Sequence, residues 1–212
     1  MKKRILIIFY ALLLCVTASF AWLSNFEANY VNNIRVKYDN GALKVVGNNF
    51  DAHIEIRNEK GDFVEIPDGE AFKFDSRKMV PDSITPFKIK IKNNSDAEAM
   101  KAKIGVAISV DPEKIKDVNV LDVIYLDVVA GDGFNKVNNY HTFVKLSDSY
   151  QVGGADTGDY FLWIYGEGSE IIIPATTAKT EYVTLDCSFY FDQNATAEYQ
   201  NQSINTLAFR LE

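Results

Sequence analysis

Apolar and polar residues alternate with a period of two along much of this chain of 212 residues. The alternation is clearest in residues 87–92, 102–110 and 182–191, where every second side chain is apolar. In the last of these segments one parity holds Val183, Leu185, Cys187, Phe189 and Phe191. Successive side chains of a strand point to opposite faces of a sheet, so each segment is predicted to form a half-buried β-strand.

Shorter apolar segments separated by turn residues extend this prediction over the chain. The further strand candidates are Ile34–Tyr38, Leu43–Val46, His53–Asn58, Phe63–Ile66, Ala71–Phe74, Val123–Val129, Tyr140–Leu146, Tyr160–Tyr165, Glu170–Ile173 and Ile204–Leu211. Asp111 and Pro112 suit the N-cap and the first position of a short helix. Many short strands with frequent turns predict an all-β fold, an antiparallel sandwich or barrel with a short helix in one connection.

The N-terminal segment has the order of a secretory signal peptide. Basic residues at positions 2–4 precede the apolar run 5–16, and Ser19 and Ala21 fill the two small positions before a cleavage site. We therefore expect residues 1–21 to be removed and Trp22 to begin a single β-sandwich domain, residues 22–212. The alternative is an uncleaved anchor, an apolar helix through residues 5–23 that would be the chain's attachment to a membrane.

The charge of the chain limits the classes of partner, and its cysteine content limits the possible disulfides. The chain carries 22 basic and 29 acidic residues, a formal charge of −7. Cleavage after Ala21 removes three basic residues and no acidic one, which leaves 19 against 29 and a charge of −10. Such a surface repels phosphate backbones, so no nucleic-acid partner is expected. Without Cys15 the mature chain keeps Cys187 alone, which excludes an intramolecular disulfide, and the parity of Cys187 predicts that it lies in the core.

Three segments resemble a family of secreted Gram-positive proteins that includes the biofilm-matrix fibre protein and camelysin. Residues 19–25, Ser-Phe-Ala-Trp-Leu-Ser-Asn, resemble the family's processing region, with Ser, Leu and Asn in place of its usual Thr, Phe and Asp. Residues 79–84 and 194–203 are similar to two later family segments. The resemblance implies a jelly-roll β-sandwich, a secreted or cell-surface location in an extracellular matrix, and cleavage by a dedicated signal peptidase.

The expected new N-terminus also suggests a mode of assembly. Trp22, Phe26, Ala28 and Tyr30 share one parity, so residues 22–31 are a candidate donor strand that adds to the sheet of another copy or of a related matrix protein. Head-to-tail repetition of that contact would produce an open filament. The preferred interpretation is a structural protein that self-associates, with no catalytic residues and no cofactor.

Two alternatives remain at this point. A camelysin-like metalloprotease would need metal ligands, but the chain has only His53 and His141, on separate strand candidates, and no His-Glu-x-x-His motif. The acidic loops 127–135 and 153–159 contain oxygen ligands suited to calcium, but they lack the pattern of an EF-hand. The other alternative is a membrane-anchored surface module that presents a loop such as 131–139 to a ligand.

N-terminal sequencing of the exported protein distinguishes cleavage from anchoring. We expect a chain that starts at Trp22, because Ser19 and Ala21 supply the small side chains that a signal peptidase accepts. A mature chain that starts at Met1 would contradict cleavage and support the anchor.

Overall fold

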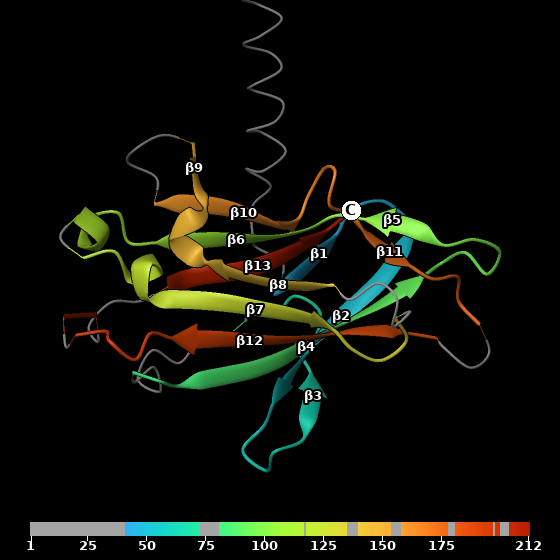
Figure 1. Cartoon of the computed structure of the whole chain (residues 1–212), viewed down its shortest axis with the longest axis horizontal. Helices are drawn as coiled ribbons and strands as arrows, with labels where there is room; N and C mark the ends of the chain where they lie inside the picture. Colours follow the sequence, from blue (N-terminus) through green and yellow to red (C-terminus); the bar gives the residue numbers. More distant parts are fainter. Residues whose placement is uncertain are drawn as a thin grey trace, which may run out of the picture. The chain divides into compact units, whose positions relative to one another are not determined.

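The computed structural model describes residues 41–72, 81–116, 118–134, 140–153, 158–177, 181–196, 198–199 and 204–212. All of them belong to one compact unit, residues 38–212. The described part of the chain is predominantly β-structure arranged in several sheets, as the alternation predicts (Figure 1). The strand predicted at Ile34–Tyr38 and the N-terminal apolar segment lie outside the described residues. No helix among the described residues is long and apolar enough to cross a membrane.

Six strands form the larger sheet. Their spatial order is β3 (Phe63–Glu65), β2 (Phe50–Arg57), β4 (Ile84–Asn93), β12 (Val183–Phe191), β7 (Ile124–Ala130) and β8 (His141–Lys145). Each neighbouring pair is antiparallel. The two clearest alternating segments of the sequence are thus confirmed as the neighbouring strands β4 and β12, with Cys187 opposite Phe87.

Five strands form the second sheet, in the order β1 (Leu43–Val45), β13 (Ile204–Leu211), β6 (Ile104–Val110), β10 (Asp159–Tyr165) and β9 (Tyr150–Val152). β1 and β13 pair in parallel, an exception to the expected antiparallel arrangement. Parallel neighbours cannot be joined by a hairpin, and almost the whole described chain lies between these two strands. A small third sheet pairs β5 (Met100–Ala102) with β11 (Ile171–Ile173).

The two larger sheets pack face to face as a β-sandwich, and phenylalanine rings fill the space between them. Phe87 of the six-stranded sheet stacks on Phe189, with the ring centres 5.0 Å apart. It also contacts Phe209 of the five-stranded sheet, with the ring centres 5.3 Å apart. Phe72, from the connection after β3, packs edge-on against Phe87 at 5.2 Å. All four side chains are buried, so the core joins both sheets and one connecting segment.

The connections differ most from the prediction. One turn of 3-10 helix at Lys114–Lys116 replaces the expected short helix, and another turn follows at Val120–Val123. Asp111 does cap the first turn, because its Oδ1 accepts a hydrogen bond from the Glu113 N–H at 3.1 Å. The burial of the Val120 turn explains why the helix does not continue: the chain must bring these apolar residues to the core.

The other differences are local. The predicted strand 102–110 is divided at Lys103, whose backbone N–H donates to the Glu212 carbonyl at 2.7 Å, so that β5 and β6 belong to different sheets. Ala71 and Phe72 are not part of a strand, and the rest of that candidate lies outside the described residues. β9 was not predicted, because its three residues are too short to show a period.

Cys187 lies on the core side of β12, as its parity predicts. Its side chain is buried between Phe87 and Val128 on the neighbouring strands. Burial raises the pKa of the thiol well above its usual range, and the nearby carboxylates of Asp186 and Asp127 raise it further. The thiol is therefore protonated and unreactive in the folded protein.

Replacing Phe189 by alanine is expected to lower the free energy of unfolding by about 3–5 kcal/mol, because the cavity would open at the centre of the ring cluster. Urea unfolding followed by circular dichroism measures this loss. Phe143→Ala is the matched control: that ring is 55% exposed, and its loss should cost less than about 1.5 kcal/mol. Equal losses for the two variants would contradict the described core.

The Cys187 thiol should resist labelling by a thiol reagent until the protein unfolds. An unfolded cysteine ionises near pH about 8.5 whereas the folded one stays protonated, so its contribution to stability is complete below that pH and is lost as the pH rises further. Urea midpoints measured from about pH 7.5 to about pH 9.5 should fall more steeply for the wild type than for Cys187→Ala. Fast labelling under native conditions, or identical slopes, would show that the thiol is accessible.

Candidate functional site

The centre of the outer face of the five-stranded sheet, which is turned away from the core, is apolar, and Arg210 on β13, opposite Gly105, borders it. Phe161 on β10 lies opposite Ala107 on β6, which lies opposite Ala208 on β13, and Trp163 lies opposite Gly105. Their neighbours along each strand have the other parity and pack in the core. Phe161, Ala107 and Ala208 are only 1%, 2% and 3% exposed, although they face outward. Phe161, Trp163, Gly105, Ala107 and Ala208 are called the outer apolar face below.

Small residues on β6 make room for the two rings of this face. A Cβ atom at Gly105 would lie 2.3 Å from Cζ of Phe161 and 3.1 Å from Cε3 of Trp163. The two rings meet edge-to-face at 4.8 Å, and Tyr150 on β9 lies 5.8 Å from Phe161. Glycine at position 105 therefore allows the rings to lie flat against the backbone of the sheet.

A strand edge borders the outer apolar face. β9 pairs with β10 only at residues 159–161. Within the described part of the chain, no strand pairs with residues 162–165 on that side of β10. An edge of this kind presents backbone N–H and C=O groups to an incoming strand. The register of β10 against β6 also shifts between Trp163 and Tyr165, which marks an irregularity at this edge.

The outer face of the six-stranded sheet is charged instead. The lysines of β4 point outward, as their parity predicts, and Lys88 and Lys92 form ion pairs. Nζ of Lys88 lies 3.5 Å from Oδ1 of Asp186, and Nζ of Lys92 lies 2.7 Å from Oε1 of Glu181. The two outer faces of the sandwich therefore differ in chemistry, and the outer apolar face is the unusual one.

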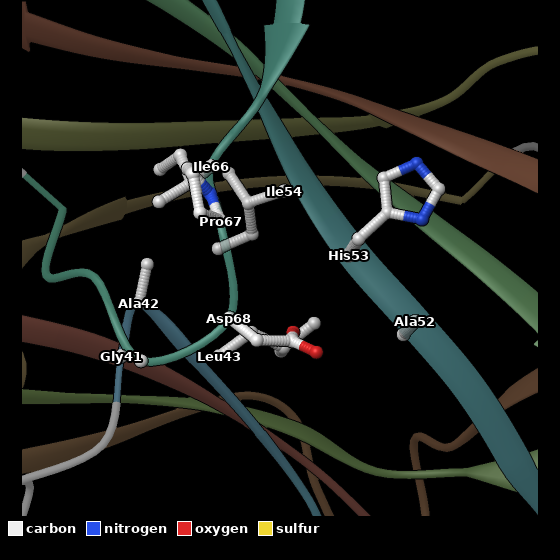
Figure 2. Close-up of a pocket in the computed structure, with 10 residues that line it drawn as sticks. Gly41, Ala42, Leu43, Ala52, His53, Ile54, Ile66, Pro67 and Asp68 are labelled. Atoms are coloured by element: carbon white, nitrogen blue, oxygen red, sulfur yellow. The ribbon is translucent and has the colours of Figure 1, made fainter.

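Two pockets among the described residues are too small for a substrate or an organic cofactor. The first has a cavity of about 30 Å³ between β1, β2 and the segment 66–69, space for about one water molecule. Figure 2 shows its lining, which includes Ile54, Ile66 and the Asp68 carboxylate, with the His53 ring on the other side of β2 from Ile54. The second, lined by Tyr160, Ile115 and their neighbours, measures about 190 Å³. Typical ligand pockets measure about 300–1,000 Å³.

The structure separates the two histidines that a zinc site would need. His53 on β2 and His141 on β8 are four strand spacings apart in the six-stranded sheet, about 19 Å. His53 lies 3.5 Å from Glu55, and Nε2 of His141 lies 2.8 Å from Oδ1 of Asp127. No group of three or more His, Cys, Asp or Glu side chains within the described residues is placed to hold a metal ion.

The site residues predicted from the sequence lie outside the described residues. These are the cleavage positions Ser19, Ala21 and Trp22 and the donor-strand positions Trp22, Phe26, Ala28 and Tyr30. Sequence reasoning missed the outer apolar face, although two signals were present. Residues 160–165 are apolar at both parities, and the outward positions of β6 are Gly105, Ala107 and Ser109, with no charged residue.

Comparisons with known proteins assign no family. No protein-family model and no curated protein matches the sequence. The fold is similar to AvmM, which catalyses macrocyclization in alchivemycin A biosynthesis, with 12% identity, 72% of this chain and 69% of that chain covered, and a TM-score of 0.36. It is also similar to endoglucanase CelQ from Clostridium thermocellum complexed with cellotriose, with 10% identity, 76% and 23% coverage, and a TM-score of 0.34.

A third similar structure is TmCBM61 in complex with β-1,4-galactotriose, with 10% identity, 61% of this chain and 65% of that chain covered, and a TM-score of 0.26. The chain thus spans less than a quarter of CelQ and just under two thirds of TmCBM61. Scores this low indicate a shared β architecture at most and carry no argument about activity or ligand.

Proposed function

We propose that this protein is a secreted or cell-surface structural protein, a subunit or accessory of an extracellular fibre or matrix, that acts by self-association through β-strand addition. The outer apolar face with its adjoining edge of β10 is the observation that carries this proposal. The signal-like N-terminus and the three family-like segments agree with it. The proposal involves no catalytic step and no cofactor.

The course of the chain supports a jelly-roll arrangement within the sandwich. From β4 onward the larger strands alternate between the sheets, except that β7 and β8 form a hairpin in the six-stranded sheet. As a result β13, β6 and β10 are neighbours in one sheet, and β4, β12, β7 and β8 are neighbours in the other. Interleaving of this kind is typical of two Greek keys wrapped into a double sheet.

The composition of the outer apolar face supports association with another strand. When one face of a sheet remains in water, polar residues that face the solvent normally alternate along each strand with apolar residues that face the core, as in β4. The outer apolar face itself holds two aromatic rings and three small residues, and the charged Arg210 lies at its border, opposite Gly105. Trp163 is the member of this face that keeps partial exposure, and covering its ring is favourable by about 25 cal/mol for each Å² of apolar surface removed from water.

The candidate donor strand matches this acceptor in pattern. In the proposed contact, residues 22–31 of one copy pair with residues 162–165 of β10 in the next copy. Alternate side chains of the donor, such as Trp22 and Phe26, would then lie on the same side of the sheet as Phe161 and Trp163. Aromatic pairs across neighbouring strands contribute about 0.2–1 kcal/mol each, and the backbone hydrogen bonds add to them.

Deleting residues 22–31 from the exported protein is expected to abolish filaments seen by negative-stain electron microscopy and the associated rise in light scattering. The deletion removes the donor and leaves the described strands intact. Trp163→Ser, which alters the acceptor, should slow assembly markedly. Tyr182→Ser is the matched control, because that ring lies on the six-stranded sheet beside His53.

The assembly proposal fails if the wild-type protein stays monomeric under every assembly condition. It also fails if the deleted protein forms the same filaments. If Tyr182→Ser and Trp163→Ser slow assembly equally, the outer apolar face is not the acceptor.

A further inference from the structure

Three segments of the chain have the sequence Asn-x-Ser/Thr, the acceptor motif of N-linked glycosylation, in which x is any residue except proline. They begin at Asn93, Asn194 and Asn201. An N-linked glycan is a bulky, solubilising group that a folded protein carries at its surface. So short a motif also arises by chance, and the surroundings of each asparagine therefore decide whether it can be an acceptor.

Burial excludes Asn93 as an acceptor in the folded protein. Asn93 ends β4 and is only 1% exposed. Its Nδ2 donates to the Glu98 carbonyl at 2.9 Å and to the Ile173 carbonyl at 3.3 Å. A sugar on this nitrogen would break buried hydrogen bonds and place a bulky polar group inside the protein, which is unfavourable. Asn201 lies outside the described residues.

The surroundings of Asn194 are the opposite. Asn194 lies in the turn that follows β12, where the Ala195 N–H donates to the Asp192 carbonyl at 3.0 Å. Asn194 and Thr196 are both exposed. Nδ2 of Asn194 donates to Oδ1 of Asp192 at 3.2 Å, in an exposed hydrogen bond that water or a transferase can replace at little cost. The acceptor nitrogen is thus accessible.

The turn holds the two residues that the motif requires at the surface. On its N-terminal side the Asp192 N–H donates to the Val123 carbonyl at 2.8 Å, which fixes the turn to the sandwich. Ala195, the middle residue of the motif, packs against the core. Its neighbours Asn194 and Thr196 are exposed on either side of it, and the Thr196 hydroxyl donates to an exposed carboxylate at 2.6 Å. Amide and hydroxyl are therefore both available to a transferase.

We propose that Asn194 is the acceptor of an N-linked glycan in the exported protein. The donor class is an oligosaccharide joined through pyrophosphate to a lipid, and an oligosaccharyltransferase catalyses the transfer. Nδ2 of Asn194 forms a bond to C1 of the first sugar, while the bond between C1 and the pyrophosphate oxygen breaks. The lipid pyrophosphate leaves with that electron pair, and the amide releases one proton to solvent. The step involves no oxidation or reduction.

This inference rests on the secretion part of the proposed function, because the transferase acts on chains that enter the export pathway. It does not rest on self-association. Asn194 follows a strand of the six-stranded sheet, whereas the outer apolar face belongs to the five-stranded sheet. Glycan attachment and filament assembly can therefore be measured separately.

Expression in a secretory host with an active oligosaccharyltransferase tests the proposal. A peptide N-glycosidase releases the glycan and converts its asparagine to aspartate, and peptide mass spectrometry then identifies the site. We expect the folded, secreted protein to be modified at Asn194 and unmodified at Asn93. The full chain is compared with one in which the host's own signal peptide replaces residues 1–21. Loss of the glycan from the full chain alone would contradict the export signal and leave the acceptor supported.

Variants of the motif establish that it is read as an acceptor. Asn194→Gln and Thr196→Ala should each abolish the modification, because one removes the acceptor nitrogen and the other removes the required hydroxyl. Thr196→Ser keeps the hydroxyl and should retain the glycan. Ser95→Ala is the matched control, because it disrupts the motif at Asn93 and should leave the glycan unchanged. Circular dichroism establishes that each variant is folded.

Three results would overturn the proposal. The first is an unmodified Asn194 in both secreted chains while a known glycoprotein from the same cells is modified, and carbohydrate confined to Asn201 counts as this result. The second is persistence of the glycan at Asn194 in Thr196→Ala. The third is a glycan on Asn93 of the folded protein, which would show that burial does not select the acceptor.

Discussion

Every other feature of this protein depends on the ring packing between its two sheets. Phe87 contacts Phe189 on its own sheet, Phe209 on the opposite sheet and Phe72 from a connecting segment. Because side chains alternate along a strand, these contacts determine which parity of β4 and β12 faces inward. A slip of one residue would bring lysines into the core and expose the rings. The core therefore also decides what each outer face presents to water.

The two outer faces that result have different capacities. The six-stranded sheet presents lysines and carboxylates in pairs. The five-stranded sheet presents the outer apolar face, where Gly105 gives room to Phe161 and Trp163. Phe161 and Trp163 can point outward because the alternate residues of β10, Leu162 and Ile164, fill the core side of that strand.

The period-two alternation in the sequence was enough to predict the long strands. Very short strands and pairings between distant segments could not be predicted from it. β4, β12 and β13 could be predicted because each has at least eight residues, which is enough to show a period. The parallel pairing of β1 with β13 could not, since no local signal joins residues so far apart in sequence. The candidate site was missed for the same reason. That Phe161 lies against Gly105 follows from the register of β10 with β6, and composition alone does not contain that register.

Electrostatics favours the outer apolar face as the surface through which copies of this chain would associate. Copies of an acidic protein repel each other at long range, although salt screens that repulsion beyond about 8–10 Å. The outer apolar face itself carries no charge, and Arg210 at its border is already paired with Glu212 at 2.6 Å, so contact there takes few charges out of water and the desolvation penalty that limits buried ion pairs stays small.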